Sequence, residues 1–277
     1  MMNTSRLNEE RAQNCNETIT VRECTSVPEF DACVRLQREA FNLPDIELSP
    51  RRHLIVSRMA GGWTLGAFVE EKMVGFVHHL VALSATRDVI GYSHMMAVAV
   101  DFQNKGVGAR LKWAQRERAL HEKVNFIKWT WDPMRARNAH FNLNRLGVIV
   151  RAYAANFYGT DYPNIADDSR QGVPKKSGID EKHGIDSDRL LGEWHLNAPR
   201  VCALAQGVTP EIDHRPARII EIPPDWSALI KRDPHEAQRE QLRVRDEFKR
   251  AFADNLICAG FARDQAQPHY LLYQGDR

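Results

Sequence analysis

Two glycines at the start of a helical segment indicate a phosphate site. Residues 98–110 read VAVDFQNKGVGAR: an apolar run ends, Gly106 and Gly108 follow one residue apart, and a helical pattern begins. A strand that turns through glycines into a helix presents several backbone N–H groups, and the positive end of the helix dipole, to one point. Because glycine has no Cβ, a pyrophosphate could approach the main chain closely. The segment therefore predicts an anion site.

The spacing of this segment differs from two common phosphate loops. A Walker loop requires G-x-x-x-x-G-K-[ST], which is not found here. The dinucleotide fingerprint G-x-G-x-x-G lacks its third glycine, because Arg110 and Leu111 stand there. What remains is Q-x-x-G-x-G, from Gln103 to Gly108, between an apolar strand and a basic helix.

Alternating strand and helix patterns surround this loop from Thr18 onward. The strand at 92–100 is apolar almost throughout, which is typical of a central strand buried on both faces. The other expected strands are 19–24, 63–71, 72–83, 125–133 and 148–159, and the expected helices are 29–41, 109–124 and 136–147.

The pattern changes after residue 159. Residues 160–189 are polar, contain Pro and Gly, and predict a long loop of the kind that forms lids, binding loops or linkers. We expect three parts: a flexible leader at 1–17, a core at 18–159, and at 160–277 a loop plus an extension that packs on the core and shapes an acceptor pocket. The extension is expected to contain strands at 190–196, 218–223, 256–264 and 269–274 and a helix at 234–255.

Composition narrows the function classes. The 277 residues include 38 basic and 36 acidic side chains, and a net charge of +2 favours neither nucleic acid nor an anionic membrane as partner. No apolar segment reaches the ~20 residues that span a bilayer, and the leader has no apolar signal region. Five scattered cysteines without a C-x-x-C pair predict a reduced, cytoplasmic location. Adjacent His78 and His79 point to opposite faces of a strand, so we expect no metal.

The loop resembles that of a known family. Gln103-Asn104-Lys105-Gly106-Val107-Gly108 fits [QR]-x-x-G-x-[GA], the pyrophosphate loop of the GNAT superfamily of acyl-CoA-dependent N-acyltransferases. The order of elements over residues 18–159 also resembles that fold. The stretch SHMMAVAV…GVGARLKWAQR…KWTWDPMRARNAHFNLNRLG is similar to a group of bacterial GNAT acetyltransferases of undefined substrate. The implied fold is α/β (α+β): a mixed, mostly antiparallel central sheet flanked by helices, with a C-terminal α/β extension.

The resemblance implies that CoA binds largely to main chain. The N–H groups from Asn104 to Ala109 would hold the pyrophosphate, and strand residues would pair with the pantetheine arm like an added strand. Lys105, Arg110 and Lys112 would meet the nucleotide's phosphates, unless they form a solvated helix face. Asn138 would cap a helix, the more common role, or contact pantetheine. The expected cofactor residues are Met96, Ala97, Val98, Val100, Gln103, Asn104, Lys105, Gly106, Val107, Gly108, Ala109, Arg110 and Asn138.

Catalysis makes separate demands. An amine with a pKa of about 10.4 is protonated, so a base or a water chain must take its proton before it attacks a thioester. Many GNAT enzymes supply a tyrosine as acid for the thiolate, four residues before the glycine that ends a core helix; here Leu143 stands there. Tyr158 is the expected substitute. His94 is the expected base and Glu193 the second candidate, although a lone histidine is more often structural.

Aromatic residues suggest an acceptor pocket. Trp129 and Trp131 share one side of their strand, and Asp132, at its end, could recognise an amine. Core packing is the alternative for both tryptophans.

The resulting hypothesis is an acyltransferase that moves an acetyl or other acyl group from acyl-CoA to a small-molecule or peptide amine. Transfer would be direct, in a ternary complex, because neither Cys24 nor Cys33 is placed as a nucleophile. One alternative is a non-catalytic acyl-CoA-binding or sensor protein, which the missing tyrosine favours. The other is an ATP- or NAD-binding protein, which the helix order fits poorly. The acceptor, the acyl chain length and a homodimer stay open.

Overall fold

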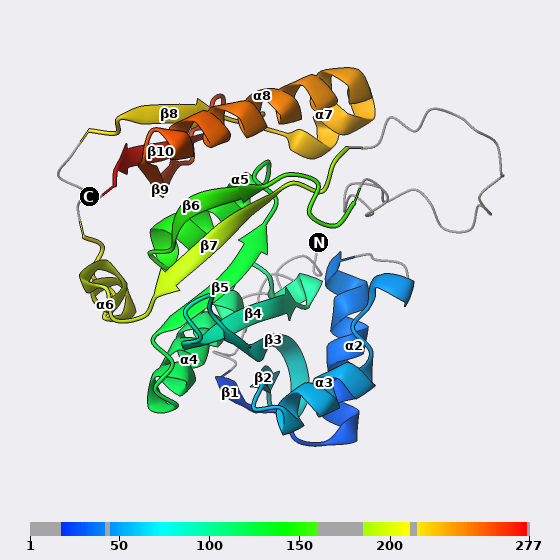
Figure 1. The fold of residues 1–277 in the computed structure, drawn as a ribbon. Helices are drawn as coiled ribbons and strands as arrows, with labels where there is room; N and C mark the ends of the chain where they lie inside the picture. The colour runs from blue at the N-terminus through cyan, green and yellow to red at the C-terminus, as the bar shows by residue number, and fades with distance from the viewer. Residues whose placement is uncertain (1–17, 42–44, 160–184, 211–214, 276–277) are drawn as a thin grey trace, which may run out of the picture.

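One continuous sheet organises the chain (Figure 1). This computed structural model describes residues 18–41, 45–159, 185–210 and 215–275. Ten strands lie in the order β1-β2-β3-β4-β5-β7-β6-β9-β10-β8. Only β4 and β5 pair in parallel among the described strands, and every other pair is antiparallel, which confirms the expected mixed, mostly antiparallel α/β fold class. The strands are β1 (Ile19–Glu23), β2 (Trp63–Val69), β3 (Lys72–Leu83), β4 (Val89–Val98), β5 (Phe126–Trp131), β6 (Ile149–Ala154), β7 (Arg189–His195), β8 (Arg218–Glu221), β9 (Leu256–Ala262) and β10 (His269–Gln274).

Helices cover the sheet, and none of those described is long and apolar enough to cross a membrane. Their bounds are α2 (Val27–Phe41), α3 (Arg51–Met59), α4 (Val107–His121), α5 (Ala136–His140), α6 (Pro199–Ala205), α7 (Trp226–Arg232) and α8 (Pro234–Ala253). Short 3-10 turns form η1 (Asp45–Glu47) and η2 (Val100–Phe102), and a π-helical turn forms η3 (Phe141–Arg145).

The two faces of the central strands pack into different cores because strand side chains alternate. Phe76 of β3 and Phe68 of β2 join α2 and α3 in one cluster. Val74 and Val77 of β3 join Leu111 of α4 in the other. The central strands therefore have α2 and α3 on one face and α4 on the opposite face.

The sheet runs across the boundary that the sequence suggested at residue 159. Strand β7, expected as part of the extension, lies between β5 and β6 and pairs with both. The last three strands then continue from β6 through β9. The expected leader at 1–17 lies outside the described residues, as does most of the long loop.

Candidate functional site

The glycine loop joins the end of β4 to α4 in a conformation suited to an anion. Asn104 and Gly106 both adopt left-handed backbone angles, with φ of 61° and 82°. Gly106 is the N-cap of α4 and has no side chain that could cap the helix, and the first turn of α4 holds no acid. A Cβ at Gly106 would meet nothing within 4 Å, so the space in front of the turn is open among the described residues. The uncapped N–H groups and the open space fit a phosphate.

Gln103 anchors this loop. Its Nε2 donates to the carbonyl of Val98 at the end of β4 over 3.1 Å, and its Oε1 accepts from Arg137 Nη1 over 3.0 Å. The glutamine of the motif thus fixes the loop to the strand through its own side chain.

The basic residues near the loop have different surroundings. Lys105 is exposed and lies 5.1 Å from the ring centroid of Phe102. Arg110 is also exposed and donates to the carbonyl of Ile19 over 3.3 Å. Lys112 is 3 % exposed and lies on the sheet-facing side of α4. The expectation that Lys112 meets a phosphate is therefore wrong.

The pairing between β4 and β5 stops after two residue pairs, and the unpaired stretch of the two strands is termed the opening. The two strands pair only at Gly91–Ile127 and Tyr92–Lys128, although both continue beyond these residues (Figure 1). The later part of β4 therefore has no β5 partner within the described strands. An extended chain could pair there, as in other strand-addition complexes.

The main chain of β4 alternates between its neighbours. Ala99 N–H donates to Val74 of β3 over 2.9 Å, so alternation turns Ala97 toward β3 and turns Met96 and Val98 toward the opening. The expected contact of Ala97 with a pantetheine arm is corrected accordingly.

The expected contact of Val100 with the pantetheine arm is also corrected. It lies in η2 beyond the strand, where its N–H donates to Glu39 Oε1 over 2.7 Å. Its carbonyl accepts from Gln103 N–H over 3.2 Å. Both of its main-chain groups are therefore engaged within the protein.

His94 occupies a bulge of β4 next to this opening. His78 of β3 faces Met95 and His79 faces Ser93, so His94 is the extra residue of the register shift. Bulges re-aim side chains and are common beside active sites. His94 is exposed, and its Nε2 lies 3.1 Å from Ser49 Oγ. Desolvation by its surroundings, followed by the charge of His53, lowers the pKa of His94, so the imidazole is neutral at pH 7.

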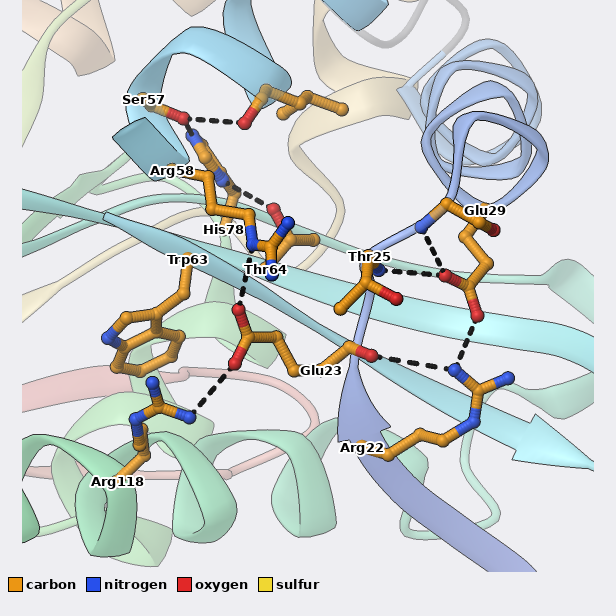
Figure 2. Close-up of polar contacts among 12 residues, drawn as sticks. Arg22, Glu23, Thr25, Glu29, Ser57, Arg58, Trp63, Thr64, His78 and Arg118 are labelled. Carbon is orange, nitrogen blue, oxygen red and sulfur yellow. Dashed lines mark hydrogen bonds and ion pairs between the residues drawn. The ribbon is translucent and has the colours of Figure 1, made fainter. Parts of the chain in front are cut away.

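Two other histidines, His53 and His78, lie next to His94. The ring centroid of His53 lies 5.6 Å from those of both His78 and His94, and the last two lie 6.1 Å apart. His78 is buried between Ser57 of α3 and Thr64 of β2, at 3.1 and 2.8 Å (Figure 2). Burial, with the neighbouring histidine charges, lowers the pKa of His78 to about 3.

The hydrogen bonds of His78 define its tautomer. Ser57 Oγ donates to the carbonyl of Leu54 over 2.9 Å, so it accepts from His78 Nε2–H, and His78 Nδ1 accepts from Thr64. His79 faces the opposite side, as expected, and stacks on Trp63 at 4.1 Å. Within the described part of the chain, no group of three or more His, Cys, Asp or Glu could hold a metal ion.

Figure 2 also shows two ion pairs of Glu23, at the β1 edge of the sheet. Glu23 of β1 accepts from Arg58 of α3 over 3.1 Å and from Arg118 of α4 over 3.0 Å. Helices on opposite faces of the sheet are thereby tied to one edge strand.

Tyr158 lies beside β4. Burial raises the pKa of Tyr92, and the neighbouring Tyr158 raises it further through its charge and a side-chain hydrogen bond. Tyr158 is 47 % exposed, and the guanidinium of Arg189 lies 5.0 Å from its ring centroid. Because Tyr92 belongs to the last β4–β5 pair, the structure brings Tyr158 to the start of the opening, two positions along β4 from His94.

The segment before β7 positions Tyr158. The N–H of Tyr158 donates to Ser187 Oγ over 2.7 Å, and the N–H of Phe157 donates to the Ser187 carbonyl over 3.0 Å. Asp188 is buried and accepts two hydrogen bonds from Arg245 of α8, each 2.8 Å long. Tyr153, the other tyrosine of this region, donates to Asp188 over 2.6 Å.

Glu193 lies apart from His94, since β5 separates β7 from β4. Its carboxylate pairs with Arg151 at 2.6 Å and lies 3.4 Å from His195 Nε2. Burial alone would raise the pKa of Glu193, but these two partners lower it below its usual value. A paired carboxylate of lowered pKa is a weak base.

The expected acceptor residues are largely packed into the protein. Trp129 and Trp131 are 8 % and 4 % exposed and belong to the core cluster that includes α4. Trp129 Nε1 donates to Asn142 over 3.3 Å. Asp132 accepts from Met134 N–H over 2.8 Å and pairs with Arg135 at 3.3 Å, and burial raises its pKa.

The helix after β5 differs from the expected continuous helix over 136–147. It changes from α5 to the π turn η3 at Phe141. Asn138 is an exposed residue inside α5, and the N-cap is Arg135, so the capping role expected for Asn138 is wrong. Leu143 is fully buried in η3.

Three residues of this region carried no clear signal in the sequence. Gln37 and Ser49 lie in α2 and in an irregular segment, and only the fold brings them to His94. Tyr92 begins the apolar strand, a position that could have marked it.

Comparisons with known proteins give solved structures alone. No protein-family model matches the chain, and no curated protein matches it in sequence. The ribosomal-protein-S18-alanine N-acetyltransferase from Escherichia coli is similar at 14% identity, over 65% of this chain and 94% of that one, with a TM-score of 0.48. A GNAT family acetyltransferase from Elizabethkingia anophelis with acetyl-CoA bound is similar at 17% identity, over 65% of this chain and 99% of that one, with a TM-score of 0.43.

A third similar structure is an aminoglycoside acetyltransferase from an uncultured soil metagenomic sample, in complex with trehalose. Its identity is 18%, it covers 39% of this chain and 74% of that one, and its TM-score is 0.36. All three of these solved structures are described as acetyltransferases, and one of them holds acetyl-CoA.

Proposed function

We propose that the protein is a GNAT-type N-acyltransferase that moves an acetyl or other acyl group from acyl-CoA to a small-molecule or peptide amine. The observation that carries the proposal is the position of the loop from Gln103 to Gly108. Its uncapped N–H groups lie at the end of β4, where the strand has already separated from β5. A phosphate at the loop and an extended arm along β4 would be continuous with each other.

Residues beside that opening would carry the separate steps of acyl transfer. Bound acyl-CoA would supply the thioester whose carbonyl carbon the amine attacks. His94, neutral at pH 7, would take the proton from the amine. The main chain of Met96 and the N–H of Val98, turned toward the opening, would hold the ligand arm, since the Val98 carbonyl already accepts from Gln103. Tyr158 would give a proton to the departing thiolate.

The extension contributes to this proposal. The Ser187–Asp188 segment and Arg245 hold Tyr158 in place, so we infer that residues 160–277 help to form the acceptor side. We also infer a reducing, cytoplasmic location, because the four cysteines of the described residues are unpaired.

Isothermal titration with acetyl-CoA, CoA, ATP and NAD tests the ligand. We expect micromolar binding of the CoA compounds alone. Gly108→Glu should abolish binding of the CoA compounds, because a carboxylate in the first turn of α4 repels phosphate. The same carboxylate interacts favourably with the helix dipole, so the helix should be retained. Gly108→Ala is the matched control, because its Cβ would meet Met96 Cε only at 3.4 Å. A folded wild-type protein that binds no CoA compound would overturn the proposal.

An amine screen with acetyl-CoA tests the reaction. Release of free thiol that depends on an added amine would confirm transfer. Tight CoA binding without turnover of any amine would instead support a sensor.

A further inference from the structure

Ser49 is held rigidly between η1 and α3. Its N–H donates to Gln37 Oε1 over 2.9 Å, and its carbonyl accepts from Gln37 Nε2 over 3.1 Å. Gln37 is 1 % exposed, so these bonds are shielded from water. Both main-chain groups of Ser49 are therefore fixed by one buried amide, and the remaining group, its hydroxyl, reaches His94 at 3.1 Å.

The groups that face His94 come from two other elements. His53 of α3 and His78 of β3 are the titratable ones, and His78 is already satisfied by Ser57 and Thr64. No carboxylate forms an ion pair with His94 in the part of the chain that the structure describes. A carboxylate would raise the pKa of the imidazole, whereas a hydroxyl orients the ring without adding a charge.

We propose that Ser49, fixed by Gln37, is a positioning residue that holds Nε2 of His94 at its hydroxyl and leaves Nδ1 as the atom that accepts the amine proton. This role requires the tautomer in which Nε2–H donates to Ser49 Oγ. The inference rests on the proposed function. As the amine nitrogen bonds to the acyl carbon, the carbon–sulfur bond breaks, the electron pair leaves with sulfur, and the amine proton goes to Nδ1.

Imidazole nitrogen NMR on the full chain tests the tautomer without any substrate. We expect His94 to carry its proton on Nε2 in the wild-type protein. Ser49→Ala should lower the pKa of His94, because the hydroxyl accepts most strongly from the protonated ring. Ser49→Thr should restore it. Ser84→Ala is the matched control, since the Ser84 hydroxyl contacts Thr86 and Asp88 in a distant turn.

A proton on Nδ1, or an unchanged His94 in Ser49→Ala, would overturn the inference. Gln37→Met, of similar size, should mix the two tautomers even though the Ser49 hydroxyl is retained. If this variant unfolds, the Ser49 variants still decide the matter.

The kinetic arm uses acetyl-CoA and the amine found in the screen. Ser49→Ala should lower kcat about tenfold and move the acidic limb of its pH profile with the NMR pKa. KM for acetyl-CoA should stay constant. The two proposals can fail separately: absent CoA binding overturns the acyltransferase, whereas the wrong tautomer in a protein that binds CoA overturns only the role of Ser49.

Discussion

Lys112 Nζ lies 3.6 Å from the ring centroid of Trp129, in a position enclosed on all sides. It donates to Ser93 Oγ over 2.9 Å and to Gln115 Oε1 over 2.8 Å, and no carboxylate pairs with it among the described residues. Burial without a counter-ion lowers the pKa of Lys112 well below its usual value. An ammonium here is held by neutral oxygens and aromatic rings alone.

Lys112→Met should therefore be at least as stable as the wild-type protein at pH 7. Between the folded and unfolded pKa values of Lys112, the unfolded chain binds more protons, so this residue makes stability rise with pH toward about 10.4. The advantage of Lys112→Met should shrink accordingly as the pH rises from 7 to 10. Urea unfolding at both pH values measures the difference, and an advantage that grows with pH would contradict it.

Gln103→Met should weaken acetyl-CoA binding about tenfold, the equivalent of one hydrogen bond of about 1.4 kcal/mol. The methionine fills the same space but cannot tie the loop to the Val98 carbonyl. Titration calorimetry measures the loss, with Arg137→Met as the control that removes the other partner of Gln103. Unchanged binding in Gln103→Met would show that the loop keeps its shape without this bond.

The buried His78 predicts loss of stability in acid. Its pKa is about 3 in the folded protein and about 6.5 in the unfolded chain. The unfolded state therefore binds the extra proton between these values, and stability falls as the pH drops below about 6.5. Between pH 7.5 and 5 the loss from His78 is about 2 kcal/mol. His78→Asn should start less stable at pH 7.5 and lose about 2 kcal/mol less, measured by urea unfolding. Equal losses would exclude the burial of a neutral imidazole here.

Arg245→Met should destabilise the protein by about 3–5 kcal/mol, because it leaves the buried Asp188 carboxylate without its ion-pair partner. Arg245→Lys should recover only part of the lost stability, because an ammonium cannot donate to both Asp186 and Asp188 as the guanidinium does. Thermal unfolding gives the order, and Arg250→Met, at an exposed position of the same helix, serves as control. We also expect thiol release to fall, because Asp188 and Ser187 hold the segment that carries Tyr158. Full activity in Arg245→Met would separate this ion pair from the site.

The loop and its flanking elements could be predicted because their signals are local. An apolar run, two glycines and a helical pattern are adjacent in the sequence, and the structure places β4, the loop and α4 there. Lys112 could not be predicted as buried, since its charge indicates solvent. The rings that enclose it, Trp129 and Trp194, come from strands whose register only the folded sheet determines.

The surroundings of His94 were equally hidden. Ser49 follows no periodic pattern, and its link to His94 spans 45 positions of the chain. The bulge that exposes His94 is a register shift between β3 and β4, a property of the pair rather than of either strand. The alternation of Trp129 and Trp131 predicted their shared side. Of the two roles left open for them, an acceptor pocket or core packing, the structure shows core packing.

The position of β7 bears on the order in which the chain can fold during synthesis. A ribosome releases β5 and β6 long before residues 189–195, yet these two strands contact the sheet mainly through β7. Until β7 is synthesised, β6 has no strand to pair with, and β5 pairs with β4 only through its first residues. The side of β5 that faces away from β4 is thus paired late, by β7, a strand far from β5 in the sequence whose docking is intrinsically slow. In a nascent chain that ends before residue 189, the loop from Gln103 to Gly108 would be present while β5 pairs only at Ile127 and Lys128 and β6 is unpaired.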